Sequence, residues 1–283
     1  MPELPEVQTI INHLKPQLIH QTILSVEVYY PPIAYHKDLN LLLKDKIICD
    51  IHRRGKYIIL VLNKGFCIIH LRMEGKFFIQ AIKDDHSKHN HASFFFKDFR
   101  LDYNDTRKFG RIDYTEGIED YFKDKLGLEP FDENLSSLYL KEKAKGRIIP
   151  VKTFILDQAV IAGIGNIYSD EILFDAKISP FKKAKSISLC EWDQIILSTR
   201  KILTLALKDG GSTIKSFAVS HEINGLFQQH LQVYSHANQA CKVCETILEK
   251  AYINGRSSVY CEKCQKVSQN ARRHYRIDGI RKK

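Results

Sequence analysis

The chain has 283 residues, which is enough for two modest domains with separate hydrophobic cores. Hydrophobic residues make up 44% of the chain and charged residues 27%, which is ordinary for a globular protein and excludes a low-complexity or fibrous chain. The sequence holds no apolar run of about 18 residues and no basic and apolar leader, so we expect an intracellular protein without a membrane span or secretion signal.

Charge and cysteine usage narrow the class of protein further. Forty-three Lys and Arg residues against 33 Asp and Glu residues give a net charge of +10, which favours a polyanionic partner such as nucleic acid. Net charge alone does not identify that partner. Four of the seven cysteines fall in two close pairs, a pattern more typical of metal binding in a reducing compartment than of disulfides.

A helix is predicted at the start of the chain. Apolar residues recur at helical spacing from Val7 to Leu18, so this segment forms one amphipathic helix that carries the N-terminus on a rigid support. We expect Pro16 to kink or fray the last turn of this helix.

Between residues 23 and 114 the pattern changes to short runs of β-branched and aromatic residues. These runs predict strands at residues 23–28, 47–51, 57–62, 67–71, 77–82, 93–96 and 111–114. Because the runs are regularly spaced and separated by Gly, Asp and Asn, they favour an antiparallel sandwich or barrel.

The sequence beyond residue 126 favours a second, helical domain. A polar helix at 134–146 is expected to bridge to it, and helical periodicity follows at 154–160, 167–176 and 187–207. A Gly-rich turn at 163–166 precedes one of these helices, and such a turn is more often a tight helix connection than a phosphate site. We expect a long loop at 212–239 and a disordered basic tail at 265–283.

Two cysteine pairs predict a metal site near the end of the chain. Sixteen residues separate the pair Cys241 and Cys244 from the pair Cys261 and Cys264. With this spacing, two tight turns can offer four thiolates to one tetrahedral Zn²⁺, and no coordination position stays open. We therefore expect one structural zinc ion that clamps a β-hairpin at 245–260, and an iron–sulfur site fits the spacing less well. The other cysteines are predicted to be buried small hydrophobes: Cys49, Cys67 and Cys190.

Two cationic residues, Arg256 and Lys56, lie at positions where the predicted local structure would let them bind a phosphate. Arg256 follows the tight-turn signal Asn254-Gly255, so it should project from the tip of the clamped hairpin. Lys56 directly precedes an apolar strand, where side-chain alternation would turn it inward toward a cleft. Each could instead be an ordinary solvated cation.

Three residues suit the space that a base leaves when it is pulled from a duplex. Such a gap is filled by flat or flexible apolar groups, and a polar group is needed to bind the base on the opposite strand that has lost its pairing partner. Arg107 and Phe109 lie two residues apart in one predicted loop, and Met73 lies in another. The alternative is that Met73 and Phe109 are core residues.

The chain begins Met1-Pro2-Glu3, and removal of Met1 would expose a secondary amine at Pro2. A chain-terminal amine has a pKa of about 7.7–8.0 against about 10.4 for lysine, so a larger fraction is unprotonated and nucleophilic at neutral pH. Such an amine can form an iminium with an aldehyde sugar, and the carboxylate of Glu3 could shuttle protons. Alternatively, Pro2 and Pro5 only begin the first helix, and Glu3 and Glu6 suit the positive end of its dipole.

Taken together, these motifs resemble the bacterial formamidopyrimidine-DNA glycosylases, base-excision enzymes that remove oxidised purines. The resemblance covers roughly residues 2–265. It rests on PELPEV, RRGKY, HLRMEGKF, KHNHA, DTRKFG, LGLEP, IAGIGNIYSDEILF, DGGSTIK, LQVY and the two CxxC pairs. The combination of PELPEV, GIGNIY and the cysteine pairs is highly specific, whereas no single motif is.

The resemblance implies an α+β fold. It places an N-terminal antiparallel β-sandwich catalytic domain with an N-terminal helix at 2–130, a linker at 131–150 and a helical domain with a DNA-binding helix–two-turn–helix element at 151–235. A C-terminal four-cysteine zinc-finger β-hairpin follows at 236–266 and a basic tail at 267–283. Double-stranded damaged DNA would lie in the cleft between the domains.

It also implies a bifunctional glycosylase and lyase that flips out 8-oxoguanine or a formamidopyrimidine. Pro2 would attack C1′ of the damaged nucleotide and hold the sugar as a Schiff base, while Glu3 would donate or accept the proton for ring opening. Lys56 would serve β-elimination and Arg256 δ-elimination, and both would bind phosphate.

The remaining implied roles are contacts with DNA. His70 and Asn166 would hold the backbone around the flipped nucleotide, His89 and Arg147 would contact DNA, and Lys215 would belong to the lid over the extruded base. The gap-filling trio matches the family's own, and its arginine would also contact DNA. We further expect a monomer that lies in the bacterial cytoplasm, associates with the nucleoid through DNA and has no membrane partner.

The chain departs from the family pattern in three ways. Asn90 stands where the family often has Asp, Arg147 stands where a lysine is common, and the tail exceeds the usual family ending. The tail is expected to make weak electrostatic contact with DNA. One alternative is a related glycosylase that prefers oxidised pyrimidines, although PELPEV and the gap-filling trio favour purines. Another alternative, a non-catalytic zinc-finger protein that binds damaged DNA, leaves the nucleophile unexplained.

Overall fold

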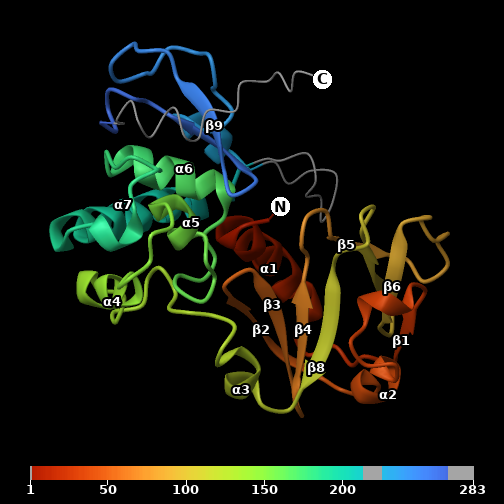
Figure 1. The fold of residues 1–283 in the computed structure, drawn as a ribbon. Helices are drawn as coiled ribbons and strands as arrows, with labels where there is room; N and C mark the ends of the chain where they lie inside the picture. Colours follow the sequence, from red (N-terminus) through yellow and green to blue (C-terminus); the bar gives the residue numbers. More distant parts are fainter. Residues whose placement is uncertain (1, 213–224, 267–283) are drawn as a thin grey trace, which may run out of the picture. The chain divides into compact units, whose positions relative to one another are not determined.

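The computed structural model describes residues 2–212 and 225–266 (Figure 1). The chain divides into two compact units. Unit 1 comprises Met1–Lys125 and Ala206–Gln228, and unit 2 comprises Leu126–Leu205 and Gln229–Lys283. Lys215 and the expected tail 267–283 lie outside the described residues.

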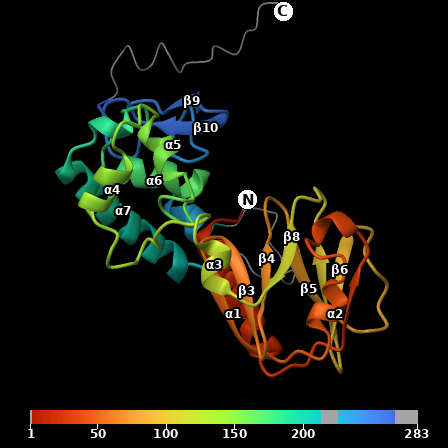
Figure 2. The same cartoon turned by 60° about the horizontal axis from the view of Figure 1, so that its bottom comes forward.

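Unit 1 is built from two four-stranded antiparallel sheets that share one core (Figures 1 and 2). The first sheet has the order β1-β6-β7-β5, with strands Ser25–Val28, Asn90–Phe95, Arg100–Asn104 and Lys76–Gln80. The second has the order β2-β3-β4-β8, with strands Ile48–Arg54, Tyr57–Leu62, Phe66–His70 and Arg111–Thr115. This is an antiparallel sandwich, one of the two architectures that the strand spacing favoured.

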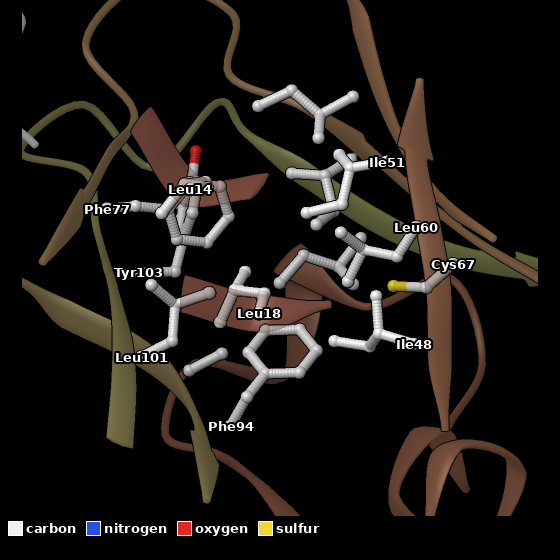
Figure 3. Packing of buried hydrophobic residues seen from close by; sticks show 14 of the residues in the cluster. Leu14, Leu18, Ile48, Ile51, Leu60, Cys67, Phe77, Phe94, Leu101 and Tyr103 are labelled. Atoms are coloured by element: carbon white, nitrogen blue, oxygen red, sulfur yellow. The ribbon is translucent and has the colours of Figure 1, made fainter. Parts of the chain in front are cut away.

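The core of unit 1 also takes up the apolar face of helix α1, Leu4–Leu18. Figure 3 shows Leu14 and Leu18 of α1 between side chains from both sheets, including Leu60 and Phe94. The helix runs through Pro16 to its end, so the expected kink does not end it early. Burial of this face fixes the start of the chain on the sandwich.

One strand of unit 1 was not predicted from the sequence. Strand β7 alternates Leu101 and Tyr103 with polar residues, and two of those polar residues are buried. Arg100 and Asp102 form an ion pair at 2.9 Å with almost no exposure, so they satisfy each other inside the fold. Charged residues in a short segment are typical of loops, which is why the pattern concealed a strand.

Unit 2 is mainly helical, and its helices support a C-terminal hairpin. The helices are α4 (Ser137–Lys143), α5 (Val151–Ile155), α6 (Asn166–Asp175) and α7 (Leu189–Lys208), the last of which ends within unit 1. The hairpin consists of β9 (Glu249–Ile253) and β10 (Arg256–Tyr260) and packs beside α6 (Figure 2). Unit 1 contains the short helices α2 (Leu39–Leu43) and α3 (Ile118–Phe122) and the 3₁₀ turn Pro31–Ile33. The 3₁₀ turn Ala184–Ser186 belongs to unit 2, and the 3₁₀ turn Phe227–His230 crosses from unit 1 to unit 2.

Several sequence expectations need correction in detail. The helix expected at 154–160 is Val151–Ile155, because Pro150 caps its start and the chain turns at Asp157. The hairpin expected from residue 245 begins at Glu249, since the preceding residues form the turn of the first cysteine pair. Cys49 and Cys190 are exposed, and only Cys67 of the three single cysteines is buried. Gln265, expected to open the tail, is buried and bonded to Cys261.

The side chain of Tyr103 holds two loops of unit 1 together. A Cβ added at Gly110 would lie 1.8 Å from the Tyr103 hydroxyl, and a Cβ at Gly75 would lie 2.1 Å from it. Both distances are far below van der Waals contact, so only glycine lets these loops close on the buried ring. The loops are those that carry Met73 and Phe109.

We predict that Gly110→Ala destabilises unit 1 by about 1–3 kcal/mol, because the added methyl overlaps a fully buried ring. Urea unfolding followed by circular dichroism measures this change. Gly117→Ala is the matched control, since the nearest atom to its added Cβ is a side-chain oxygen of Asp120 at 3.8 Å. Adding Tyr103→Phe to the Gly110 variant should restore part of the loss. Equal stability of the two alanine variants would contradict the packing argument.

Candidate active site and metal centre

The start of the chain is fixed by the first turn of α1. Pro2 and Glu3 are buried, and Glu3 is the N-cap residue of the helix. The backbone N–H of Glu3 donates to Glu6 Oε2 at 2.9 Å in a capping-box arrangement. The peptide that follows Pro2 is therefore held directly by a buried carboxylate.

Glu6 also holds a second segment of unit 1, which the sequence did not reveal. Its Oε1 accepts hydrogen bonds from the Ser212 backbone N–H at 2.8 Å and from the Ser212 hydroxyl at 3.1 Å. Gly211 has a φ of +81°, and a Cβ there would lie 2.7 Å from Glu6 Oε1. One carboxylate thus joins the chain start to the residues that lead into 213–224. Only the glycine pair at 210–211 hinted at this close approach.

Lys56 and His70 lie at one end of the second sheet of unit 1. Lys56 is buried as predicted, although it lies in the turn between β2 and β3, directly after Gly55, rather than in a strand. His70 is also buried, and its Nδ1 accepts a hydrogen bond from the backbone N–H of Arg72 at 2.9 Å. Burial, and then the charges of Arg72 and Lys56, lower the pKa of His70 to about 3. At neutral pH the ring is therefore neutral and carries its proton on Nε2.

The gap-filling trio lies on exposed loops rather than in the core. Met73 is 37% exposed and Phe109 is 47% exposed, and the Arg107 guanidinium lies 5.0 Å from the centre of the Phe109 ring. The buried carboxylate of Asp105 shapes the second loop, because it accepts hydrogen bonds from the backbone N–H groups of residues 107, 109 and 110. Exposed apolar side chains on a firmly held loop suit insertion into a base stack.

His89 lies next to the same loop. It is partly exposed, and its carbonyl accepts a hydrogen bond from the backbone N–H of Asp105 at 3.1 Å. Asn90 is buried and donates to Ser93 Oγ at 2.8 Å, so the residue that departs from the family pattern has a structural contact. His89 is therefore held near the trio by backbone pairing.

In unit 2, Arg256 stands at the tip of the β9–β10 hairpin. Asn254 and Gly255 have φ values of +47° and +75°, as the predicted tight turn requires, and Arg256 is exposed. Asn166 begins α6 and donates from Nδ2 to the Ser257 carbonyl at 3.0 Å. Asn166 thus contacts the residue that directly follows Arg256 in the hairpin.

A buried ion pair holds strand β10 of this hairpin, and sequence reasoning missed it. Lys152 Nζ lies 2.7 Å from Asp170 Oδ1 and donates to the Ser257 carbonyl at 2.8 Å. Asp170 also accepts hydrogen bonds from the Ser258 hydroxyl at 2.7 Å and the Val259 N–H at 3.1 Å. An acidic residue in the middle of an apolar helix was the available signal, since such residues are buried only when they are paired.

Arg147 is more exposed and has an acidic partner of its own. Its Nη1 lies 2.9 Å from Asp157 Oδ2, and both side chains are more than a third exposed. Its guanidinium also lies 5.4 Å from the Phe154 ring centre. A phosphate at this position would compete with Asp157 for the guanidinium.

The four paired cysteines form the predicted metal centre. Their sulfurs lie within 4.8 Å of one another, with Sγ–Sγ distances of 3.9 Å from Cys241 to Cys264 and 3.4 Å from Cys244 to Cys261. A tetrahedron of Zn–S bonds of about 2.3 Å requires S–S separations of about 3.8 Å. The four thiolates therefore fit one zinc ion, and their soft sulfur donors favour it.

The fold and this site define a two-unit protein with a β-sandwich, a helical domain and a zinc finger. Family models match it as the formamidopyrimidine-DNA glycosylase N-terminal domain at residues 1–112 and the corresponding H2TH domain at 126–218. A third model, the zinc finger found in FPG and IleRS, matches at 238–267.

Relatives and solved structures agree with these models. A formamidopyrimidine-DNA glycosylase of Ureaplasma parvum is 41% identical over 94% of this chain and all of its own length. A point mutant of the Lactococcus lactis FPG in complex with Fapy-dG-containing DNA matches with a TM-score of 0.89 at 34% identity, covering 94% of this chain and all of its own. The Lactococcus lactis Fpg with abasic-site DNA gives a TM-score of 0.88 at 34% identity and the same coverage. The chain belongs to the formamidopyrimidine-DNA glycosylase family.

We predict that His70 makes the fold less stable as the pH falls. Its folded pKa of about 3 lies below its unfolded value of about 6.5, so its contribution is complete above pH 6.5 and is lost progressively as the pH falls toward 3. Urea unfolding between pH 7 and 4 should show a slope about 1.4 kcal/mol per pH unit steeper for the parent than for His70→Gln below about pH 6. The exposed His52→Gln is the control. Parallel slopes for the parent and His70→Gln would contradict the assignment.

We also predict that Cys244→Ser removes the zinc and disorders the hairpin, because three thiolates cannot complete the tetrahedron. Metal analysis should fall from about one zinc per chain to a small fraction of that, and binding to an abasic-site duplex should weaken at least tenfold. Cys190→Ser, an exposed cysteine outside the cluster, should change neither quantity. A full zinc complement in the Cys244 variant would show that the cluster has another role.

Proposed function

We propose that this protein is a bifunctional DNA glycosylase and lyase that excises oxidised purines, such as 8-oxoguanine and formamidopyrimidines, and then cuts the strand. The observation that carries the proposal is the fixed chain start: Pro2 and Glu3 are buried at the head of α1, on the support of a capping box. Such a position suits a terminal amine that must meet one carbon atom of a flipped nucleotide.

The first step uses the secondary amine that removal of Met1 exposes. The lone pair of the Pro2 nitrogen attacks C1′, the bond from C1′ to the base breaks, and the base leaves with a proton. Opening of the sugar ring then gives an iminium between Pro2 and C1′, for which Glu3 supplies or accepts the proton at the ring oxygen. The low intrinsic pKa of a terminal amine keeps a large unprotonated fraction at neutral pH.

The strand is then cut by two eliminations. Loss of a proton from C2′ of the iminium expels the 3′ phosphate, and a second elimination expels the 5′ phosphate. Lys56 supports the first elimination and Arg256 the second, each by holding the departing phosphate. The burial of Lys56 and the rigid mounting of Arg256 on its tight turn support these roles.

The remaining site residues bind the DNA around the flipped nucleotide. The neutral ring of His70 offers an Nε2–H to a phosphate, and Asn166 begins α6 beside the hairpin. Met73, Arg107 and Phe109 fill the vacated stack, and their exposure supports that role. The DNA contacts of His89, Arg147 and Lys215 stay predictions from the family resemblance.

The zinc finger has a structural part in this scheme. When bound, a zinc ion would cross-link the two cysteine turns, and the described cluster offers it no open coordination position. The hairpin between the turns would then present Arg256. We also propose that the protein acts as a monomer on duplex DNA in the cytoplasm and nucleoid. Among the described residues, no helix is both long and apolar enough to cross a membrane.

We predict that borohydride reduction traps this protein on a duplex that contains 8-oxoguanine, and that the trapped residue is Pro2. Mass spectrometry of the digested adduct should place the DNA remnant on the N-terminal peptide. Protein that retains Met1 should give at least a hundredfold less adduct, because its secondary amine is blocked as an amide. Pro5→Ala, which leaves the Pro2 amine in place, is the matched control. An adduct on Lys56 instead would overturn the assignment of the nucleophile.

A further inference from the structure

A row of three residues crosses the outer face of the second sheet of unit 1. Tyr57 of β3 pairs with His70 of β4, and His70 pairs with Arg111 of β8. Their neighbours Ile58, Ile69 and Ile112 belong to the core between the sheets. Because side chains alternate along a strand, the row faces away from that core. The outer face of this sheet therefore carries an aromatic ring, an imidazole and a guanidinium in one row, rather than only simple solvent-exposed polar side chains.

This face holds a cavity of about 380 Å³. Its volume is within the range of small-molecule sites. The cavity is lined by Tyr35, Tyr57, Ile68, His70, Arg72, Arg111, Asp113, Tyr121 and Lys125. Of these residues, only His70 has a role in the function proposed above.

The cations around this cavity have no carboxylate partner among the described residues. Arg111 donates only to the backbone carbonyls of Phe109 and Gly110, at 3.3 and 2.7 Å. Lys125 lies 3.7 Å from the centre of the Tyr121 ring, and neither it nor Arg72 forms an ion pair in the described parts of the chain. The cavity therefore has an excess of positive charge that an anion can neutralise.

The one acidic side chain in the lining is already engaged. Asp113 Oδ1 lies 3.0 Å from His36 Nε2, and burial together with the nearby Asp113 carboxylate raises the pKa of Tyr121. Asp113 is therefore already engaged by His36. Tyr121 also packs edge-on against Phe122, whose ring packs against Tyr57. Two aromatic walls are thus fixed by neighbours rather than by a ligand.

We propose that this cavity binds a nucleotide unit, with the base against the tyrosine rings and the phosphate at Arg72 and Arg111. Flat aromatic walls suit a base, and every base can stack on them. Guanidinium groups suit a phosphate because they can donate two parallel hydrogen bonds to it. The Nε2–H of neutral His70 can add a further donor without adding charge.

Two sources offer this chemistry. One is a free nucleoside monophosphate, and the other is a nucleotide of a DNA strand that the protein has bound. Only the second source rests on the proposed function, since it needs DNA at His70. A sugar or a simple carboxylic acid would use the cations but leave the tyrosine walls unused.

The first arm of the test titrates zinc-loaded, full-length protein with dGMP, inorganic phosphate and deoxyguanosine, followed by calorimetry and saturation-transfer NMR. If the ligand is a free nucleotide, dGMP should bind saturably and at least tenfold more tightly than deoxyguanosine or phosphate. Arg111→Gln and Tyr121→Leu should each weaken dGMP at least tenfold. Tyr121→Phe should retain most of the binding, because it keeps the ring.

The second arm measures the affinity for an abasic-site duplex as a function of salt. If a strand nucleotide occupies the cavity, Arg111→Gln should weaken the duplex about tenfold and reduce the slope of log K against log salt by about 1. Lys97→Gln, an exposed lysine at the β6–β7 turn of the other sheet, is the charge-matched control. It should change neither dGMP binding nor the duplex slope.

A loss of binding on Arg111→Gln in either arm supports the proposal. A loss in the first arm identifies a free nucleotide as the ligand, and a loss in the second arm identifies a nucleotide of bound DNA. Absence of an Arg111 effect in both arms, or an equal effect of Lys97→Gln, would overturn it. Borohydride trapping of Arg111→Gln at saturating DNA separates this proposal from the catalytic one. That variant should still give the Pro2 adduct, whereas failure of the parent to form an adduct would count only against the proposed chemistry.

Discussion

The proposed chemistry requires that the start of the chain be held in a fixed position. A chain terminus is ordinarily the least ordered part of a domain, and a nucleophile there needs a fixed position to react. The carboxylate of Glu6 provides it, because one oxygen accepts the Glu3 N–H and the other accepts two hydrogen bonds from Ser212. The apolar face of α1 in the sandwich core then transfers the rigidity of unit 1 to Pro2. Loss of this carboxylate would free two segments of the site at once.

Unit 2 also uses a buried carboxylate that accepts several hydrogen bonds, in this case to hold the C-terminal hairpin. Asp170 is buried, and it accepts hydrogen bonds from Lys152 and from two residues of β10. Removing one member of such a pair leaves a buried charge without a partner, at a cost of about 3–5 kcal/mol. The pair therefore fixes the strand that begins with Arg256 more firmly than hairpin pairing alone. In both units, a buried carboxylate binds the backbone close to a proposed site residue: Glu6 binds next to Pro2, and Asp170 binds the strand that begins with Arg256.

The sequence predicted the parts of the site that have a local signature. The cysteine spacing, the Asn254-Gly255 turn and the buried position of Lys56 each follow from a few adjacent residues, and the structure agrees with all three. The contacts of Glu6 and Asp170 join residues up to 206 positions apart, so no local pattern could identify their partners. Strand β7 was missed for a related reason, because the partner that makes Arg100 compatible with burial is visible only in the folded sheet.

The cavity on the outer face of the second sheet is also formed by residues that lie far apart in the sequence and that the fold brings together. Tyr57 and His70 lie within motifs of the family resemblance, whereas Arg111, Tyr121 and Lys125 come from segments with no motif of their own. Cross-strand pairing brings Arg111 to His70, and α3 brings Tyr121 over them. Because these cations have no acidic partners among the described residues, the arrangement costs electrostatic energy in the free protein. An anionic ligand at this face would recover that energy, which gives the cavity a physical reason to bind phosphate.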